Sequence, residues 1–259
     1  MRKIFIRMSF LADNYYGSQK LNNHPTIQGA FEDALSNVFN EKIKVTICSR
    51  LDRFVNAFDF AISFSTINTN LSLDRLKFYL SNYLKDIHIK DVKEVDNSFS
   101  SRYSCKGKIY SYLIQNGSYN PLFKNTSLYL KNKIDEDKLK EGLSFFEGEH
   151  EFKNFASFDE EEESKLLINK TLLTKENGLT ILSFSSRNFL KYQIRFMVGT
   201  ILQYGYNKIL KEDIKKLLAG ENIKFQRKKV EPNGLFLYKI IYPEFDDDNL
   251  EFDEIKIFK

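Results

Sequence analysis

The sequence predicts an α+β protein, and three observations support this class. Its length of 259 residues is enough for one large domain or two small ones. Hydrophobic residues make up 42% of the chain, which is typical of a globular protein. The first 97 residues alternate between predicted strands and helices in the order β-α-β-β-α-β, which is the order of a split βαβ, ferredoxin-like half.

Two kinds of pattern give the elements of this first half. Alternating or β-branched stretches predict strands over 2–10, 45–47, 61–64 and 87–95, and apolar residues at helical spacing predict helices over 27–38 and 73–84. Thr26 stands directly before the first helix, where its hydroxyl can cap the free backbone N–H groups.

The second half continues with the same signals. It predicts strands over 106–114, 180–185 and 237–242, and helices over 135–146, 189–202 and 209–218. The acidic run 159–163 predicts a mobile loop. The tail from residue 244 onward carries acids but no clear element.

An acid stands between two arginines on the connection between the second and third strands. Asp52 is flanked by Arg50 and Arg53. An acid on such a loop is most often a turn residue that hydrogen-bonds its own backbone. Two neighbouring cations would also lower its pKa and keep it ionised. An ionised carboxylate beside cations suits a nucleophile whose substrate is a polyanion.

Composition excludes several classes of protein. No apolar run is long enough to cross a membrane, and the basic start lacks the apolar core of a signal peptide, so we expect a cytoplasmic protein. The two cysteines and three histidines offer no ligand spacing for a metal.

Charge is compatible with a nucleic-acid partner. The net charge is only +4, but it becomes +16 when the twelve acids of 159–163 and 244–254 are left out. A body this basic fits a phosphate backbone, and it fits an ordinary solvated surface rich in lysine equally well.

Residues 49–57 read Ser-Arg-Leu-Asp-Arg-Phe-Val-Asn-Ala. This stretch resembles the catalytic motif of the tRNA pseudouridine synthase A family, Gly-Arg-Thr-Asp-x-Gly-Val-His-Ala. The arginine, aspartate, valine and alanine match, whereas Ser49, Leu51, Phe54 and Asn56 depart from the pattern.

Other stretches resemble the same family in collinear order, from about residue 3 to residue 243. They are the loop and helix start at 15–35, the stretch 99–105, the strand with Tyr110, the run 148–155, the helix with Arg195, and the segment 232–237. Phe10 and Leu11, which stand just before the first of these, and Ser18 within it depart from the pattern. We interpret His150, in the fourth, as a structural hydrogen-bonding residue.

The resemblance implies an enzyme that isomerises uridine to pseudouridine in RNA, with the anticodon stem-loop of tRNA as its expected target and with no cofactor or metal. It implies catalytic roles for Asp52 as nucleophile, Arg195 as its ion-pair partner, Tyr110 as the residue that stacks on the extruded uracil, and Arg50 as the residue that fills the vacated RNA stack. It implies substrate binding by Leu235, Tyr15, Gln19 and Arg102.

The resemblance also bears on architecture. We expect two ferredoxin-like halves with joined antiparallel sheets and a central cleft, at 1–97 and 98–243, followed by an acidic tail at 244–259. Family members resemble homodimers in which one RNA contacts both subunits, so we expect a homodimer.

The departures keep two other functions open. A paralogue could bind RNA without catalysis, or an enzyme could act on another RNA such as rRNA; the survival of the four catalytic positions argues against lost catalysis. Phe54 replaces a glycine, and phenylalanine strongly disfavours a positive φ. We therefore expect the loop to follow another path or the RNA to approach differently, and the enzyme to act on a narrower or displaced set of uridines.

Overall fold

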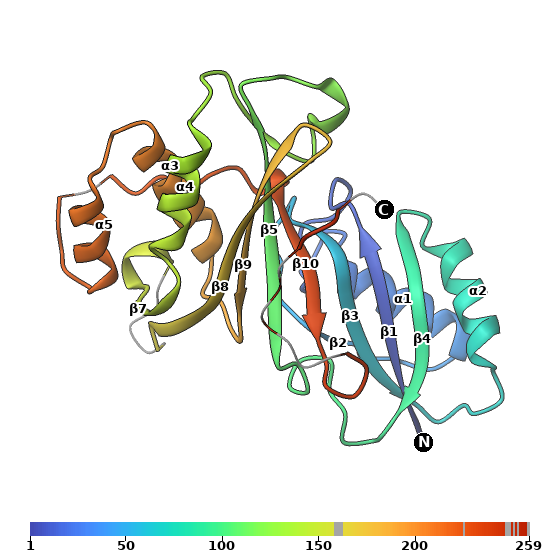
Figure 1. Ribbon diagram of the computed structural model, residues 1–259. Helices are drawn as coiled ribbons and strands as arrows, with labels where there is room; N and C mark the ends of the chain where they lie inside the picture. Colours follow the sequence, from blue (N-terminus) through green and yellow to red (C-terminus); the bar gives the residue numbers. More distant parts are fainter. Residues whose placement is uncertain (158–162, 225, 247–249, 251, 253, 258–259) are drawn as a thin grey trace. The chain divides into compact units, whose positions relative to one another are not determined.

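The computed structural model describes residues 1–157, 163–224, 226–246, 250, 252 and 254–257, which form two compact units (Figure 1). Unit 1 comprises Met1–Lys106 and Leu237–Asp248, and unit 2 comprises Gly107–Phe236 and Asn249–Lys259. Each unit combines strands and helices, so the predicted α+β class is confirmed. Most of the acidic run 159–163, and residues 247–249, 251, 253 and 258–259 of the acidic tail, lie outside the described residues.

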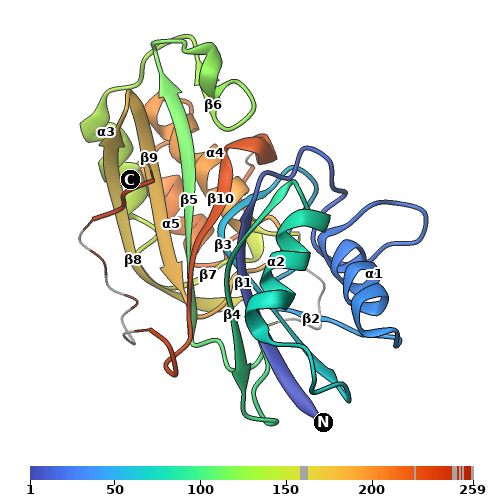
Figure 2. The same cartoon turned by 90° about the vertical axis from the view of Figure 1, so that its right-hand side faces the viewer.

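Unit 1 has the strand order of a ferredoxin-like half. It contains β1 (Arg2–Phe10), α1 (Ile27–Phe39), β2 (Thr46–Ile47), β3 (Asn56–Thr66), α2 (Leu73–Tyr83) and β4 (Ile87–Val95). Strand β1 pairs antiparallel with β3 and β4, and β2 pairs antiparallel with β3. Both helices lie on the same side of these strands (Figure 2). The predicted split βαβ arrangement of this half is therefore confirmed.

Local sequence explains the two helices of unit 1. The hydroxyl of Thr26 accepts a hydrogen bond from the Gly29 N–H at 3.2 Å and caps α1, as predicted. Phe31 and Leu35 on α1 are fully buried, as is Leu80 on α2. Burying side chains of this size contributes about 1.5–3 kcal/mol each, and this holds the helices on the sheet.

Unit 2 repeats the arrangement with additions. Its elements are β5 (Gly107–Asn116), β6 (Leu128–Leu130), α3 (Glu136–Ser144), β7 (Gly148–Glu151), β8 (Lys165–Glu176), β9 (Leu179–Ser186), α4 (Gln193–Gly205) and α5 (Lys211–Leu218), with short 3-10 helices at Pro121–Phe123, Lys153–Phe155 and Pro232–Gly234. The strand order is β5-β9-β8-β7, and β6 pairs parallel with β5. Strand β10 (Leu235–Ile241) begins in this unit and ends in unit 1, where it lies beside β3.

One predicted helix needs correction, and one long strand was missed. The helix predicted over 189–202 begins only at Gln193, because Tyr192 before it has a left-handed backbone with φ 63°. The long strand β8 was not predicted at all. It forms a hairpin with β9 through Asn177 and Gly178, whose positive φ angles of 49° and 80° suit a two-residue hairpin turn.

Candidate active site

Asp52 opens a tight turn between β2 and β3 in unit 1. The N–H of Val55 donates to the carbonyl of Asp52 at 3.1 Å and closes the turn. Phe54, at its third position, has φ 65°, the sign that a type II turn requires there. The expectation that phenylalanine would force this loop onto another path is therefore wrong: the positive φ is kept, and the ring lies against the neighbouring Arg53 guanidinium, 4.4 Å from ring centroid to Cζ.

Two residues of the preceding loop, Gly17 and Ser18, pack against the backbone that leads into this turn and act as its brace. The Ser18 hydroxyl donates to the carbonyl of Ser49 at 2.9 Å and accepts from the N–H of Leu51 at 2.7 Å. The Ser18 N–H donates to the carbonyl of Leu51 at 3.0 Å. Gly17, with φ 93°, lies so close that a Cβ there would come within 2.6 Å of the Leu51 oxygen. The backbone leading into Asp52 is thus fixed by a fully buried serine.

Several departures from the family motif are packing residues here. Asn56 is buried, and its side-chain oxygen accepts a hydrogen bond from the Ala12 N–H at 2.8 Å. Leu51 is buried, and Phe10 packs edge-on against Phe60. These side chains are buried in the interior of unit 1.

The other predicted residues of unit 1 differ in exposure. Arg50, Gln19 and Arg102 are exposed, and the Arg102 guanidinium lies 5.2 Å from the ring centroid of Tyr103. Tyr15 is buried, and its burial, together with the nearby carboxylate of Asp86, raises the pKa of its hydroxyl. Tyr15 therefore keeps its proton at neutral pH.

Unit 2 carries the predicted tyrosine on β5. Tyr110 is 7% exposed, and the ring of Phe189 meets it edge-on at 5.2 Å. Tyr112 is buried more deeply: its hydroxyl donates to the carbonyl of Glu231 at 2.7 Å, and burial raises its pKa far above the ordinary value. Of the two tyrosines, only Tyr110 retains exposed surface that a substrate could meet.

Arg195 on α4 is tied to the segment before β10. Its Nε donates to the carbonyl of Val230 at 2.8 Å, and the Val230 N–H donates back to its carbonyl at 3.3 Å. Gly199, one turn later, allows close approach, because a Cβ there would lie 1.8 Å from the carbonyl oxygen of Lys228. Leu235 is 6% exposed at the first position of β10.

The structure thus places the predicted site residues in two groups. Asp52, Arg50, Tyr15, Gln19 and Arg102 belong to unit 1, and Tyr110, Arg195 and Leu235 belong to unit 2. The ion pair between Asp52 and Arg195 would join the two units, and it stays a prediction. Motif comparison missed Ser18 as a brace; the signal was a small polar residue beside a glycine in a loop.

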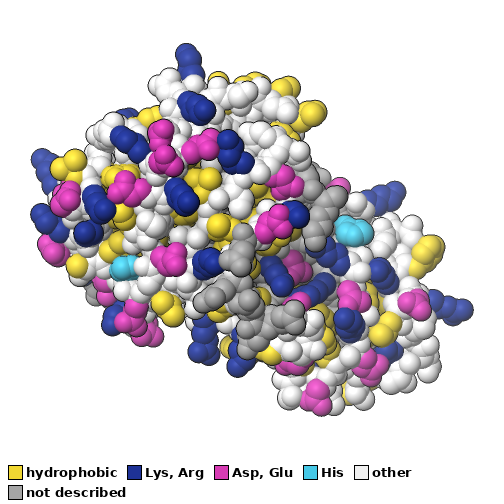
Figure 3. Space-filling model, viewed as in Figure 1, with side chains coloured by type: hydrophobic (Ala, Val, Ile, Leu, Met, Phe, Trp, Pro, Cys, Tyr) yellow, Lys and Arg dark blue, Asp and Glu magenta, His cyan; other side chains and the backbone are white. Residues whose placement is uncertain are grey.

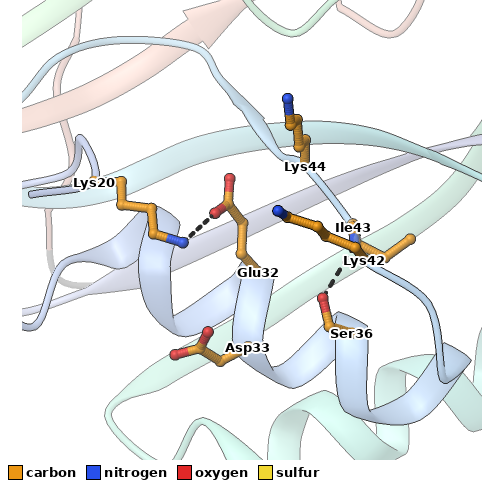
Figure 4. A pocket seen from close by; sticks show the side chains of 7 residues that line it. All are labelled: Lys20, Glu32, Asp33, Ser36, Lys42, Ile43 and Lys44. Atoms are coloured by element: carbon orange, nitrogen blue, oxygen red, sulfur yellow. Dashed lines mark hydrogen bonds and ion pairs between the residues drawn. The ribbon is translucent and has the colours of Figure 1, made fainter. Parts of the chain in front are cut away.

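A hollow elsewhere on unit 1 is lined by none of the predicted catalytic or substrate-binding residues. It is lined by Lys20, Glu32, Asp33, Ser36, Lys42, Ile43 and Lys44 (Figure 4). The Lys20 ammonium pairs with Glu32 at 2.7 Å in the wall of the hollow.

Among the described residues, no group of three or more His, Cys, Asp and Glu side chains could hold a metal ion. Within the same part of the chain, every helix is too short or too polar to cross a membrane.

Comparison with known proteins identifies the family. A family model described as tRNA pseudouridine synthase matches residues 144–243. The chain is 32% identical to the tRNA pseudouridine synthase A of Caldicellulosiruptor bescii, over 93% of this chain and 100% of that protein. The chain belongs to the tRNA pseudouridine synthase A family. The family predicted from the motifs is confirmed.

A second relative in sequence belongs to the same family, whereas the similarity to a solved structure is remote. The tRNA pseudouridine synthase A of Aquifex aeolicus is 32% identical over 93% of this chain and 100% of that protein. A chain in the crystal structure of a Cbf5-Nop10-Gar1 complex aligns with a TM-score of 0.37 and 12% identity, over 74% of this chain and 43% of that one. The sequence alignments, which span 93% of the chain, include the loop of Asp52.

Proposed function

We propose that this protein isomerises uridine to pseudouridine in tRNA, with uridines of the anticodon stem-loop as its targets. The observation that carries the proposal is Asp52 of the family's catalytic motif, held on a braced, half-buried turn in a chain of this family. A loop that served only as a connection would have no need of a fully buried serine fixing the backbone before its acid.

The reaction requires the base to leave the RNA stack. Uridine and pseudouridine are isomers: the bond from C1′ to N1 breaks, a bond from C1′ to C5 forms, and the proton on C5 is lost as N1 gains one. The enzyme must extrude the nucleotide to reach these atoms. Asp52 acts as the nucleophile, on the uracil ring or on the sugar, and splits the exchange into two steps.

The remaining residues position the base and the carboxylate. Arg195 pairs with Asp52 and orients it. Tyr110 stacks on the extruded uracil, and its hydroxyl moves a proton. Leu235 lines the base pocket, and Arg50 fills the space that the uracil leaves in the RNA. The partial exposure of Tyr110, in contrast to the buried Tyr112, supports the role of Tyr110.

Cations on unit 2 support an RNA partner. Residues 226–230 form a strap along α4, and Arg227, Lys228 and Lys229 are exposed on it. The Lys229 ammonium lies 3.8 Å from the ring centroid of Tyr192. The face in Figure 3 carries Lys and Arg side chains interspersed with carboxylates. RNA contact on that face would therefore rest on particular cations and less on one uniform basic field.

We place the protein in the cytoplasm as a homodimer, on the resemblance to its family.

Two other functions lead to different predictions. A paralogue without catalysis would bind tRNA and leave its uridines unchanged, and an enzyme for rRNA would modify rRNA alone.

Pseudouridine mapping tests the proposal against both alternatives. Total RNA from cells with and without the protein should differ at tRNA anticodon-arm uridines, and purified protein should restore those sites in unmodified tRNA. Differences confined to rRNA would show that the substrate is rRNA and not tRNA. Purified protein that binds tRNA but leaves its uridines unmodified would contradict the catalytic role.

A further inference from the structure

The guanidinium of Arg53, beside the nucleophile, lies against two aromatic rings, an arrangement that we call the clamp. Its Cζ lies 4.0 Å from the ring centroid of Tyr16 and 4.4 Å from that of Phe54. The Tyr16 ring in turn stacks on His24, with centroids 4.3 Å apart and planes 12° from parallel. Four planar groups from two loops of unit 1 therefore lie in successive contact, in the order His24, Tyr16, Arg53 and Phe54.

This clamp leaves the hydrogen-bonding edge of the guanidinium unused. A guanidinium has N–H donors pointing outward in its plane, and both rings lie within 4.4 Å of the Arg53 Cζ. Arg53 is exposed, and within the described part of the chain no carboxylate or carbonyl accepts from its side chain. The sequence predicted that Arg53 acts as a cation beside Asp52 that helps to keep it ionised; in the structure its guanidinium also lies against two rings, and its donors remain available.

The backbone of Phe54 indicates that the clamp is a built feature. A non-glycine residue at φ 65° adopts a conformation that is costly for a bulky side chain, and such residues cluster where function requires them. The family motif has glycine here, which takes this φ without cost. The phenylalanine keeps the turn and adds the second wall of the clamp.

We propose that Arg53 binds a phosphodiester group of the RNA next to the target uridine, and that Tyr16 and Phe54 position it. A planar fork fixed in orientation matches two phosphate oxygens, and fixing it in advance reduces the conformational entropy lost on binding. Because Arg53 follows Asp52 directly, the phosphate it holds belongs to the backbone beside the extruded nucleotide. This inference rests on the proposed function and adds a substrate-positioning residue to it.

The test compares Arg53→Gln with Arg75→Gln, which removes the same charge from an exposed position on α2. Dissociation constants for unmodified tRNAs of different sequence are measured at several salt concentrations, with tritium release as the activity readout. We expect Arg53→Gln to weaken binding about tenfold on every tRNA and to lower the log-log salt slope by about 1. Arg75→Gln should change neither quantity.

Two further variants separate charge from geometry. Arg53→Lys keeps the charge and should preserve the salt slope, while binding weakens several-fold because the fork is lost. Phe54→Gly keeps Arg53 and opens the clamp, so it should also weaken binding several-fold with an unchanged slope.

The outcomes distinguish this inference from the proposed function. Arg53→Gln behaving like Arg75→Gln, while the wild-type protein releases tritium, would overturn the phosphate contact alone. A loss restricted to tRNAs with one particular base would overturn it in favour of base recognition. Wild-type protein that binds tRNA without releasing tritium would overturn the catalytic proposal, whatever the Arg53 variants do.

Discussion

Removal of the Ser18 hydroxyl tests whether the brace serves the turn of Asp52. Ser18→Ala deletes one hydrogen bond to the Ser49 carbonyl and one from the Leu51 N–H, at 2.9 and 2.7 Å. The serine is fully buried, so water does not readily replace the lost partner. A buried group left without its partner costs about 1–3 kcal/mol. For the two backbone groups together, we expect the free energy of unfolding to fall by about 2–4 kcal/mol.

Urea unfolding and tritium release measure the two consequences. The midpoint and slope of the unfolding curve give the stability loss. Turnover of the folded variant should fall more than about tenfold, since a displacement of the nucleophile by roughly 1 Å costs about a hundredfold in rate.

Ser36→Ala provides the matched control for Ser18→Ala. Its hydroxyl accepts a single hydrogen bond, from the N–H of Ile43 at 3.0 Å, away from the turn (Figure 4). This variant should lose about 1 kcal/mol and keep full turnover. Wild-type turnover in Ser18→Ala, or a stability loss no larger than that of Ser36→Ala, would refute the brace.

Three other predictions concern the same unit and the chemistry. Gly17→Ala should destabilise the protein by about 2 kcal/mol or more in urea unfolding, because φ 93° is unfavourable for alanine and its Cβ would lie 2.6 Å from the Leu51 oxygen; stability equal to wild type would contradict this packing. Burial alone would raise the pKa of Glu32, but hydrogen bonds from Lys20, the Val45 N–H and Gln28 outweigh it and lower that pKa. Its contribution is therefore present above the unfolded pKa of about 4.3 and lost as pH falls through the lower folded value, so Glu32→Gln should cost about 1–2 kcal/mol at pH 7 and progressively less below pH 4; a difference independent of pH would contradict it. Activity should persist in excess chelator with spermidine to keep the tRNA folded, and a loss restored only by one divalent ion would show that the reaction needs a metal.

The elements that the sequence predicted well are those governed by local pattern. Strand β4 was predicted with the bounds it has, since its first residues alternate between buried and exposed positions, and α1 begins after its predicted cap Thr26. The start of α4 was predicted too early, because the left-handed Tyr192 depends on tertiary packing that helical spacing does not reveal. Strand β8 was missed although Asn177 and Gly178 are a hairpin signal, because its apolar and polar residues do not alternate cleanly.

The site shows the same division between local and tertiary information. Motif spacing identified Asp52, Tyr110 and Arg195 because the family places those residue types in a fixed order. It could not show that Phe54 keeps a positive φ, since the contacts of Arg53 with the rings of Phe54 and Tyr16 form only in the folded loop. Backbone propensity correctly indicates that a positive φ is unfavourable for Phe54. The folded loop adopts it nevertheless, with the ring in contact with Arg53.

Replacement of the nucleophile tests the central claim most directly. Asp52→Asn keeps the size of the side chain and removes the charge that attacks the nucleotide. Tritium release from uridine-labelled tRNA and tRNA affinity should be measured on the same preparation. We predict that release is abolished while affinity stays within a few-fold of wild type, because the carboxylate performs chemistry and adds little to phosphate binding. Turnover retained by Asp52→Asn would contradict the account.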